Sequence, residues 1–184
     1  VQPSINFDGA ANLNLAQDLY SNPALTLTDG TTFGAFNLIK FYSGTMDASG
    51  AQNTQYILAQ STDSYIGLRK DILKATSGFE GEEDGSDTGS VYQDAGSITA
   101  GQRVSVLLYV RQSTPGRIEG TLCVLVEGGT WEYSSFTRAG PLVATQLGNV
   151  TIGDRSNGNR EFTGTLSRAA VWANVPADVL DLMP

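Results

Sequence analysis

Histidine is absent from the 184-residue chain, and cysteine occurs only once. Without histidine the chain lacks the Ser-His-Asp and Cys-His arrangements, the commonest general base and the commonest transition-metal ligand. The single cysteine, Cys123, excludes an intramolecular disulfide and disfavours a cysteine-based zinc site. Because Cys123 lies in the apolar run Leu122–Val126, we expect a small buried hydrophobe rather than a reactive thiol. The candidate chemistries that remain are catalysis by carboxylates and the binding of hard cations.

Basic residues are scarce as well. Lysine occurs only as Lys40, Lys70 and Lys74, and the formal net charge is −8. Such a chain repels phosphate backbones, so nucleic acid is not an expected partner. Its negative charge disfavours anionic membranes for the same reason. No apolar run approaches the roughly 20 residues needed to span a bilayer, so we expect no membrane insertion.

Glycine is abundant, with 21 residues, and hydrophobic residues make up 40% of the chain. This composition is typical of a globular chain with many turns between short strands. The clearest alternation is Val104, Val106, Leu108 and Val110, which share one face of a strand. Strands are expected at Ile5–Leu15, Phe36–Tyr42, Gln55–Gln60, Tyr65–Arg69, Val91–Asp94, Arg103–Arg111, Thr121–Glu127, Val150–Gly153 and Thr163–Trp172.

Long helices do not alternate with these strands, which argues against a parallel α/β sheet. The best helical candidate is Pro176–Met183, because proline is favoured in a first turn and Val179, Leu180 and Met183 fall on one side. The sequence therefore predicts one domain over residues 1–184. We expect an all-β antiparallel sandwich of jelly-roll type with a short C-terminal helix.

The last third of the chain carries a recognisable order of motifs. It consists of Val150-Thr-Ile-Gly153, then the run Phe162–Trp172, then Pro176-Ala-Asp-Val-Leu180. This order resembles the closing segment of laminin-G-like domains in the concanavalin A-like lectin and glucanase superfamily. The earlier motifs resemble the family's strands in the expected order, at Ile5–Gly9, Phe36–Tyr42, Tyr56–Leu58, Tyr65–Arg69, Arg103–Tyr109 and Gly120–Gly128. The Trp-His pair often found in the strand at Arg103–Tyr109 is missing, so the resemblance implies the fold and not a close relative.

An acidic stretch, Glu80–Asp87, places five carboxylates in eight residues. Clustered oxygen ligands on a flexible loop are what calcium needs, and members of the resembled family often hold calcium at a rim loop. The stretch lacks EF-hand spacing, and we favour a solvated loop of mutually repelling charges. If calcium binds here, the expected ligands are Glu82, Asp84 and Asp87.

The same stretch raises the question of glycoside hydrolysis, because glucanases share the resembled superfamily. Retaining hydrolysis needs two carboxyl groups roughly 5–5.5 Å apart across the scissile bond. Glu80 and Glu82 alternate, but the neighbouring Gly81, Gly85 and Ser86 predict a loop. No Glu-x-Asp-x-Glu strand occurs, so we do not expect an enzyme.

Two further segments hold candidate ligand-binding residues. Trp131 and Tyr133 share one face of an extended segment, where they could stack on a sugar or a neighbouring subunit, or form a wall of the core. The polar loop Asp154–Glu161 offers Asp154 and Asn157 to sugar hydroxyls, although an Asn-Gly turn with solvated charges is the favoured interpretation. Trp172 is expected in the core.

Two functions are compatible with these features. The first is an extracellular carbohydrate-binding or adhesion module, with calcium as an optional cofactor. The second is a virion structural protein, such as a decoration, fibre or spike component, that binds other protein chains as a homo-oligomer or within a particle. We rank glycan binding slightly ahead of assembly.

Overall fold

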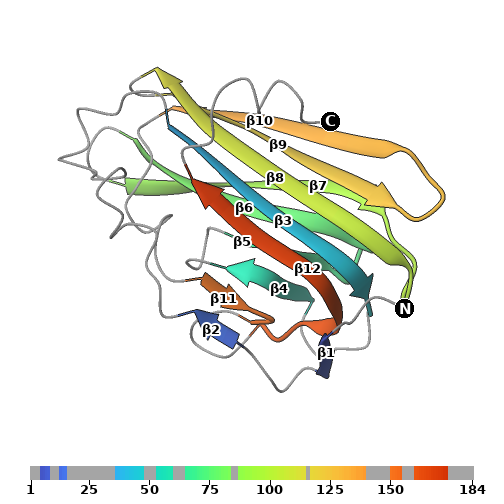
Figure 1. Ribbon diagram of the computed structural model, residues 1–184. Helices are drawn as coiled ribbons and strands as arrows, with labels where there is room; N and C mark the ends of the chain where they lie inside the picture. The colour runs from blue at the N-terminus through green and yellow to red at the C-terminus, as the bar shows by residue number, and fades with distance from the viewer. Residues whose placement is uncertain are drawn as a thin grey trace.

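The computed structural model describes residues 5–8, 13–15, 36–47, 53–59, 65–83, 87–114, 117–139, 150–154 and 160–173. This part of the chain forms twelve strands and no helix (Figure 1). The strands are β1 (Ile5–Asp8), β2 (Leu13–Leu15), β3 (Phe36–Met46), β4 (Thr54–Ala59), β5 (Tyr65–Arg69), β6 (Lys74–Glu83), β7 (Asp87–Ser97), β8 (Arg103–Thr114), β9 (Arg117–Val126), β10 (Trp131–Ala139), β11 (Val150–Ile152) and β12 (Thr163–Ala173).

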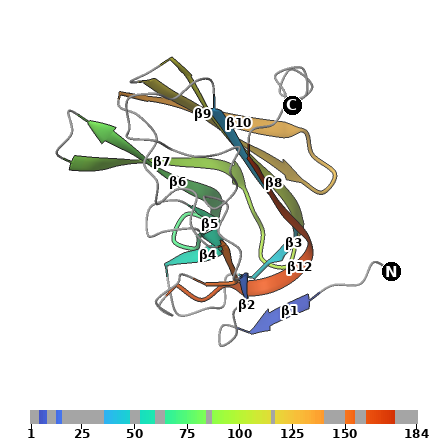
Figure 2. The same cartoon turned by 60° about the vertical axis from the view of Figure 1, so that its left-hand side comes forward.

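The strands form two six-stranded antiparallel sheets. Sheet A has the order β1-β12-β3-β8-β9-β10, and sheet B has the order β2-β11-β4-β5-β6-β7. Figure 2 shows β3, β8 and β12 in one layer and β4, β5 and β6 in the other. The chain crosses repeatedly between the layers, and β12 inserts between β1 and β3. This sandwich with crossing connections is a jelly roll, so the predicted fold class is confirmed. The predicted C-terminal helix lies outside the described residues.

The main core lies between the sheets. On β8, Val104, Val106, Leu108 and Val110 are all fully buried, as the alternation predicts. They pack with sheet B side chains such as Ile66 and with the rest of one continuous cluster. The inner faces of both sheets are therefore covered by core packing. If the strands bind another molecule, they bind it on the two outer faces or at the sheet edges.

Several predictions about the strands need correction. The predicted strand Ile5–Leu15 is two strands, β1 in sheet A and β2 in sheet B. Strands β6 and β10 were not among the predicted strands, although an extended segment was expected at Trp131 and Tyr133. The predicted loop at Glu80–Asp87 is also wrong in part, because Glu80 to Glu83 continue β6 and Asp87 begins β7. There the backbone ladder to β7 overrides the weak strand preference of glycine and acidic residues.

Candidate functional site

A pocket of about 410 Å³ opens on the outer face of sheet B. We call it the Tyr56–Tyr65 pocket. Strands β4, β5 and β6, the turn after β5 and the segment before β12 supply its lining. The lining residues are Asn53, Thr54, Tyr56, Tyr65, Arg69, Asp71, Thr76 and Arg160.

Two stacked tyrosines form the apolar wall of the pocket. The rings of Tyr56 and Tyr65 lie with centroids 3.8 Å apart at an interplanar angle of 10°. Both side chains are buried, and with Ala59 they form a cluster separate from the main core. A bulge between Tyr56 and Leu58 in the β4–β5 ladder explains the arrangement, since Ile57 and Leu58 both join the main core while Tyr56 turns outward.

Glycine is required between the pocket's strands. Gly67 lies in register between Tyr56 on β4 and Thr76 on β6. A Cβ atom at this position would collide with the carbonyl oxygen of Gln55. The close approach of β4 and β5 at the bulge therefore excludes every other residue type unless the backbone moves.

The side-chain hydroxyl of Thr76 lies at the pocket wall and is unsatisfied. Its side chain is fully buried, and it is one of the lining residues. Within the described part of the chain, its Oγ1 has no hydrogen-bond partner. Buried polar atoms are rarely left in this state, because the lost hydration costs roughly 1–3 kcal/mol. Such an atom at a pocket wall is suited to bind a ligand's hydroxyl or carboxylate.

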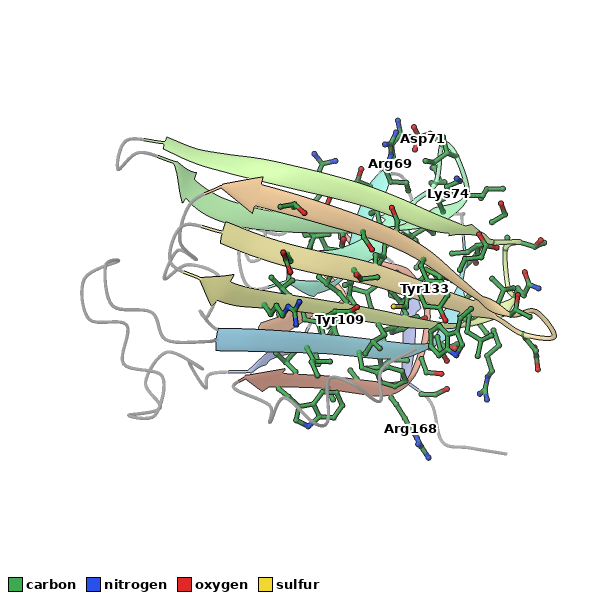
Figure 3. All side chains as sticks on the ribbon, turned by 90° about the horizontal axis from the view of Figure 1, so that it is seen from above. Arg69, Asp71, Lys74, Tyr109, Tyr133 and Arg168 are labelled. Atoms are coloured by element: carbon green, nitrogen blue, oxygen red, sulfur yellow. The ribbon has the colours of Figure 1, made fainter. Side chains whose placement is uncertain are left out.

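Arg69 and Asp71 form an ion pair at one side of the pocket. Arg69 donates from Nη2 to Oδ2 of Asp71 at 2.7 Å and from Nε to Oδ1 at 3.2 Å. The hydrogen bond from Arg69 lowers the pKa of the Asp71 carboxyl. Both side chains are more than one third exposed, so the pair adds little to stability. In Figure 3, Arg69, Asp71 and Lys74 lie together, away from Tyr109 and Tyr133.

Backbone hydrogen bonds hold Arg160 at the pocket. Its N–H donates to Oδ1 of Asp154 at 2.8 Å, and its carbonyl accepts from the N–H of Tyr56 at 2.8 Å. The loop's base is closed by Gly153 and Phe162, whose N–H groups donate to Ile57 and Gly153. Asp154 is only 2% exposed, so its carboxylate positions Arg160 from within the protein.

The predicted ligand-binding residues do not meet in one place. Trp131 and Tyr133 lie on the outer face of sheet A, whereas Asp154 lies beside the Tyr56–Tyr65 pocket. Asn157 lies outside the described residues. The ligand roles of all four stay predictions.

The predicted metal ligands fall at the end of the β6–β7 hairpin where β6 leads into β7. In the ladder Glu82 pairs with Thr88 and Asp87 pairs with Glu83, while Asp84 lies outside the described residues. Among the described side chains, no group of three or more His, Cys, Asp or Glu residues could hold a metal ion. Those of Glu82 and Asp87 are not in that set, so the calcium site stays a prediction.

The outer face of sheet A differs sharply from the pocket. Ile39, Leu107 and Cys123 are buried there, and Phe41, Tyr109 and Trp131 pack against them. Tyr133 and Trp172 are 54% and 48% exposed. We call this set, from Trp172 on β12 across to Tyr133 on β10, the sheet A apolar face.

One prediction about aromatic burial is wrong on this face, and one open alternative is decided. Trp172 was expected in the core, but Val171 packs inward and the alternation of β12 turns Trp172 to the outside. For Trp131 and Tyr133 a wall of the core was one open alternative, and neither residue belongs to the main core cluster. The burial of Cys123 is confirmed, and that burial raises the pKa of its thiol to about 11.

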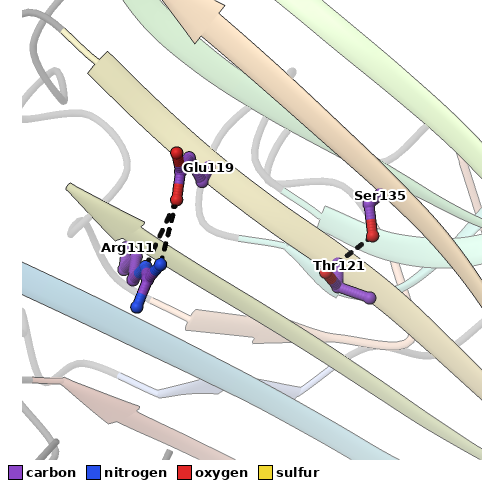
Figure 4. Close-up of polar contacts among 4 residues, drawn as sticks. All are labelled: Arg111, Glu119, Thr121 and Ser135. Carbon is purple, nitrogen blue, oxygen red and sulfur yellow. Dashed lines mark hydrogen bonds and ion pairs between the residues drawn. The ribbon is translucent and has the colours of Figure 1, made fainter. Parts of the chain in front are cut away.

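Polar pairs border the sheet A apolar face. Arg111 donates to Oε2 of Glu119 at 3.1 Å, and the hydroxyls of Thr121 and Ser135 lie 3.0 Å apart (Figure 4). These cross-strand pairs join β8 to β9 and β9 to β10. They mark where the face changes from apolar to polar.

Sequence reasoning missed the pocket. The available signal was the pair of aromatics at Tyr56 and Tyr65 in two short strands, with Gly67 two residues after Tyr65. The strand pattern predicts that the two strands form a hairpin, but it does not predict the bulge that turns the Tyr56 ring outward beside Tyr65. Arg160 could not be placed from the sequence, because it lies 91 residues from Arg69.

Comparisons with known proteins give a fold likeness only. No protein-family model matches the chain, and no curated protein matches it in sequence. Among solved structures, the chain is similar to the Caenorhabditis elegans galectin LEC-6, at 10% sequence identity and a TM-score of 0.35. That alignment covers 92% of this chain and 95% of the galectin. In the described part of the chain, no helix is long and apolar enough to cross a membrane.

Proposed function

We propose that this chain is a non-catalytic recognition module that binds carbohydrate in the Tyr56–Tyr65 pocket. The observation that carries the proposal is the unsatisfied Oγ1 of Thr76 beside a wall of stacked tyrosine rings. Sugars present apolar C–H faces together with hydroxyls that donate and accept hydrogen bonds. A pocket that combines aromatic rings with few polar groups has the composition of a small-ligand site.

The lining residues favour binding over catalysis. Asp71 is the only carboxylate among the lining residues that the structure describes, and it is held by Arg69. Hydrolysis of a glycosidic bond by the usual route needs two carboxyl groups at the site. The arrangement therefore suits a ligand that is held and released unchanged.

The test is a glycan array probed with the purified chain, with and without calcium. Thr76→Val removes the hydroxyl and keeps the side-chain shape, so we expect binding to fall about tenfold as one hydrogen bond is lost. Thr121→Val, in a strand of the opposite sheet, is the matched control and should bind as wild type does. A folded chain that binds no glycan under either condition contradicts the proposal.

The proposal also covers the calcium dependence of glycan binding and the place where the module acts. Loss of glycan binding on chelation would support the site at Glu82, Asp84 and Asp87, and calcium-independent binding would remove it. We expect the module to act at a cell exterior or a virion surface, where glycans and other chains are accessible.

Assembly with other protein chains is the second candidate, and the sheet A apolar face favours it. Two large side chains, Tyr133 and Trp172, are about half exposed beside buried Ile39 and Leu107. Contiguous apolar patches of this kind often mark protein contacts. Sedimentation velocity tests it. A higher-order species that dissociates in a Tyr133→Ser, Trp172→Ser variant supports assembly, and a monomer at high concentration contradicts it.

A further inference from the structure

We propose that the Tyr56–Tyr65 pocket selects sugars that carry a negative group, a carboxylate or a sulfate. This inference rests on the proposed function and adds the ligand's charge. Charge is distributed unevenly over the chain. The whole chain has a formal net charge of −8, yet the described lining residues include two arginines and one carboxylate, which leaves 2 − 1 = +1.

Other cations lie beside the lining. Lys74 is the register partner of Arg69 on the neighbouring strand, and Lys70 directly follows Arg69. The backbone N–H of Lys70 donates to the carbonyl of Asn53, a lining residue, at 2.7 Å. Four of the chain's eleven basic residues, Arg69, Lys70, Lys74 and Arg160, therefore gather at or beside this pocket.

Arg160 is the cation best placed to bind an anion. Within the described part of the chain it forms no ion pair, whereas Arg69 is held by Asp71. Its backbone is fixed on both sides, by the carboxylate of Asp154 and by the N–H of Tyr56. A guanidinium on a fixed backbone loses less freedom on binding, and its fork of N–H donors matches the oxygens of a carboxylate or sulfate.

Thr76 supplies a second, independent feature. Its buried hydroxyl is unsatisfied at the pocket wall, and the stacked rings of Tyr56 and Tyr65 lie beside it. A ligand that meets all these groups has an apolar face, hydroxyls and one anionic substituent. Uronic and sialic acids have this chemistry, and so do sugars that carry a sulfate.

The experiment compares matched sugars by isothermal titration at low and high salt. The pairs are methyl glucoside with methyl glucuronide, and galactose with galactose 6-sulfate, added to the full chain. We expect the anionic member to bind at least about tenfold more tightly at low salt, with the difference shrinking as salt rises. Preference for the carboxylate or the sulfate member identifies the source of the charge.

Three variants test the residues. Arg160→Gln should reduce the preference to less than about threefold while neutral sugars still bind. Asp71→Asn should strengthen binding of the anionic member, because it frees Arg69, and a misfolded variant could not gain affinity. Arg168→Gln, on β12 of sheet A, is the control and should leave the preference unchanged.

The outcomes separate the two proposals. Equal binding of neutral and anionic members overturns the inference and leaves carbohydrate binding standing. An unchanged preference in Arg160→Gln overturns the assignment of the anion to this pocket. Binding of none of the sugars, by a chain that is folded, overturns the proposed function itself.

Discussion

The two outer faces of the sandwich are built from similar strands but present opposite chemistry. On sheet B, a polar pocket surrounds stacked Tyr56 and Tyr65 and is bordered by arginines. On sheet A, apolar side chains from Trp172 to Tyr133 run across the strands and only their borders are polar. A glycan would suit the first face and another protein chain the second.

Local geometry explains much of this contrast. The bulge in β4 and the absence of a side chain at Gly67 open a recess on sheet B, which the end of β5 lines with Arg69 and the segment before β12 lines with Arg160. In sheet A, the ladders β3–β8 and β9–β10 are regular over these residues, so every second side chain faces outward and fills the surface. The same fold can thus support two functions, and the site decides which one it serves.

The largest difference that we expect between the faces concerns their tyrosines. Tyr65 is 3% exposed and stacked on Tyr56, whereas Tyr133 is 54% exposed. Tyr65→Ala should lower the free energy of unfolding by about 3 kcal/mol through lost burial and a cavity. Tyr133→Ala should cost less than about 1 kcal/mol. Urea denaturation measures both, and equal losses would show that the sheet A apolar face is part of the stabilising core.

Lys40 is a buried charged residue on the inner side of sheet A, in contrast to the exposed charged residues of the outer faces. It lies on β3 between Ile39 and Phe41 of the apolar face, and it is fully buried, which lowers its pKa from 10.5 to about 7. Between these values the unfolded chain holds a proton that the folded chain has released. Unfolding therefore takes up a proton, and stability rises with pH across this window.

From pH 7 to pH 9 we expect the free energy of unfolding to increase by roughly 2 kcal/mol from this residue. Lys40→Met removes the titrating group and should give a flatter profile in the same range. Denaturation at several pH values compares the two. Parallel profiles for wild type and variant would contradict the buried, perturbed lysine.

The reactivity of the Cys123 thiol tests how well the sheet A apolar face excludes solvent. With a pKa of about 11, its thiolate fraction at pH 8 is smaller than that of an ordinary thiol by roughly 200-fold. Labelling with iodoacetamide should therefore be slower than in the urea-unfolded chain by at least this factor. Rapid labelling of the folded protein would mean that the face opens readily to solvent.

The smallest effects are expected for the two ion pairs, one on each face. Arg111–Glu119 and Arg69–Asp71 are both well exposed, so a double-mutant cycle on either should give less than about 1 kcal/mol of coupling in stability. Only the Arg69–Asp71 cycle should change sugar binding. An effect of Arg111→Ala on sugar binding would contradict the placement of the site on sheet B.

The alternation on β8 and the turn residues were enough to predict an antiparallel sandwich, because a period of two with frequent breaks allows few other folds. Strand β6 was missed because its glycine and acidic residues carry weak strand preference and its pairing with β7 supplies the stability. Trp172 was misplaced because one position along a strand decides between core and surface.

The sequence alone thus determined the fold class, the missing histidine chemistry and the burial of Cys123, since these depend on composition and on neighbours along the chain. Only the tertiary structure decided which outer face carries a pocket. That choice depends on a one-residue bulge at Tyr56 and on bringing Arg160 next to a strand about one hundred residues earlier. Such contacts are set by the pairing of distant strands, which local patterns do not encode.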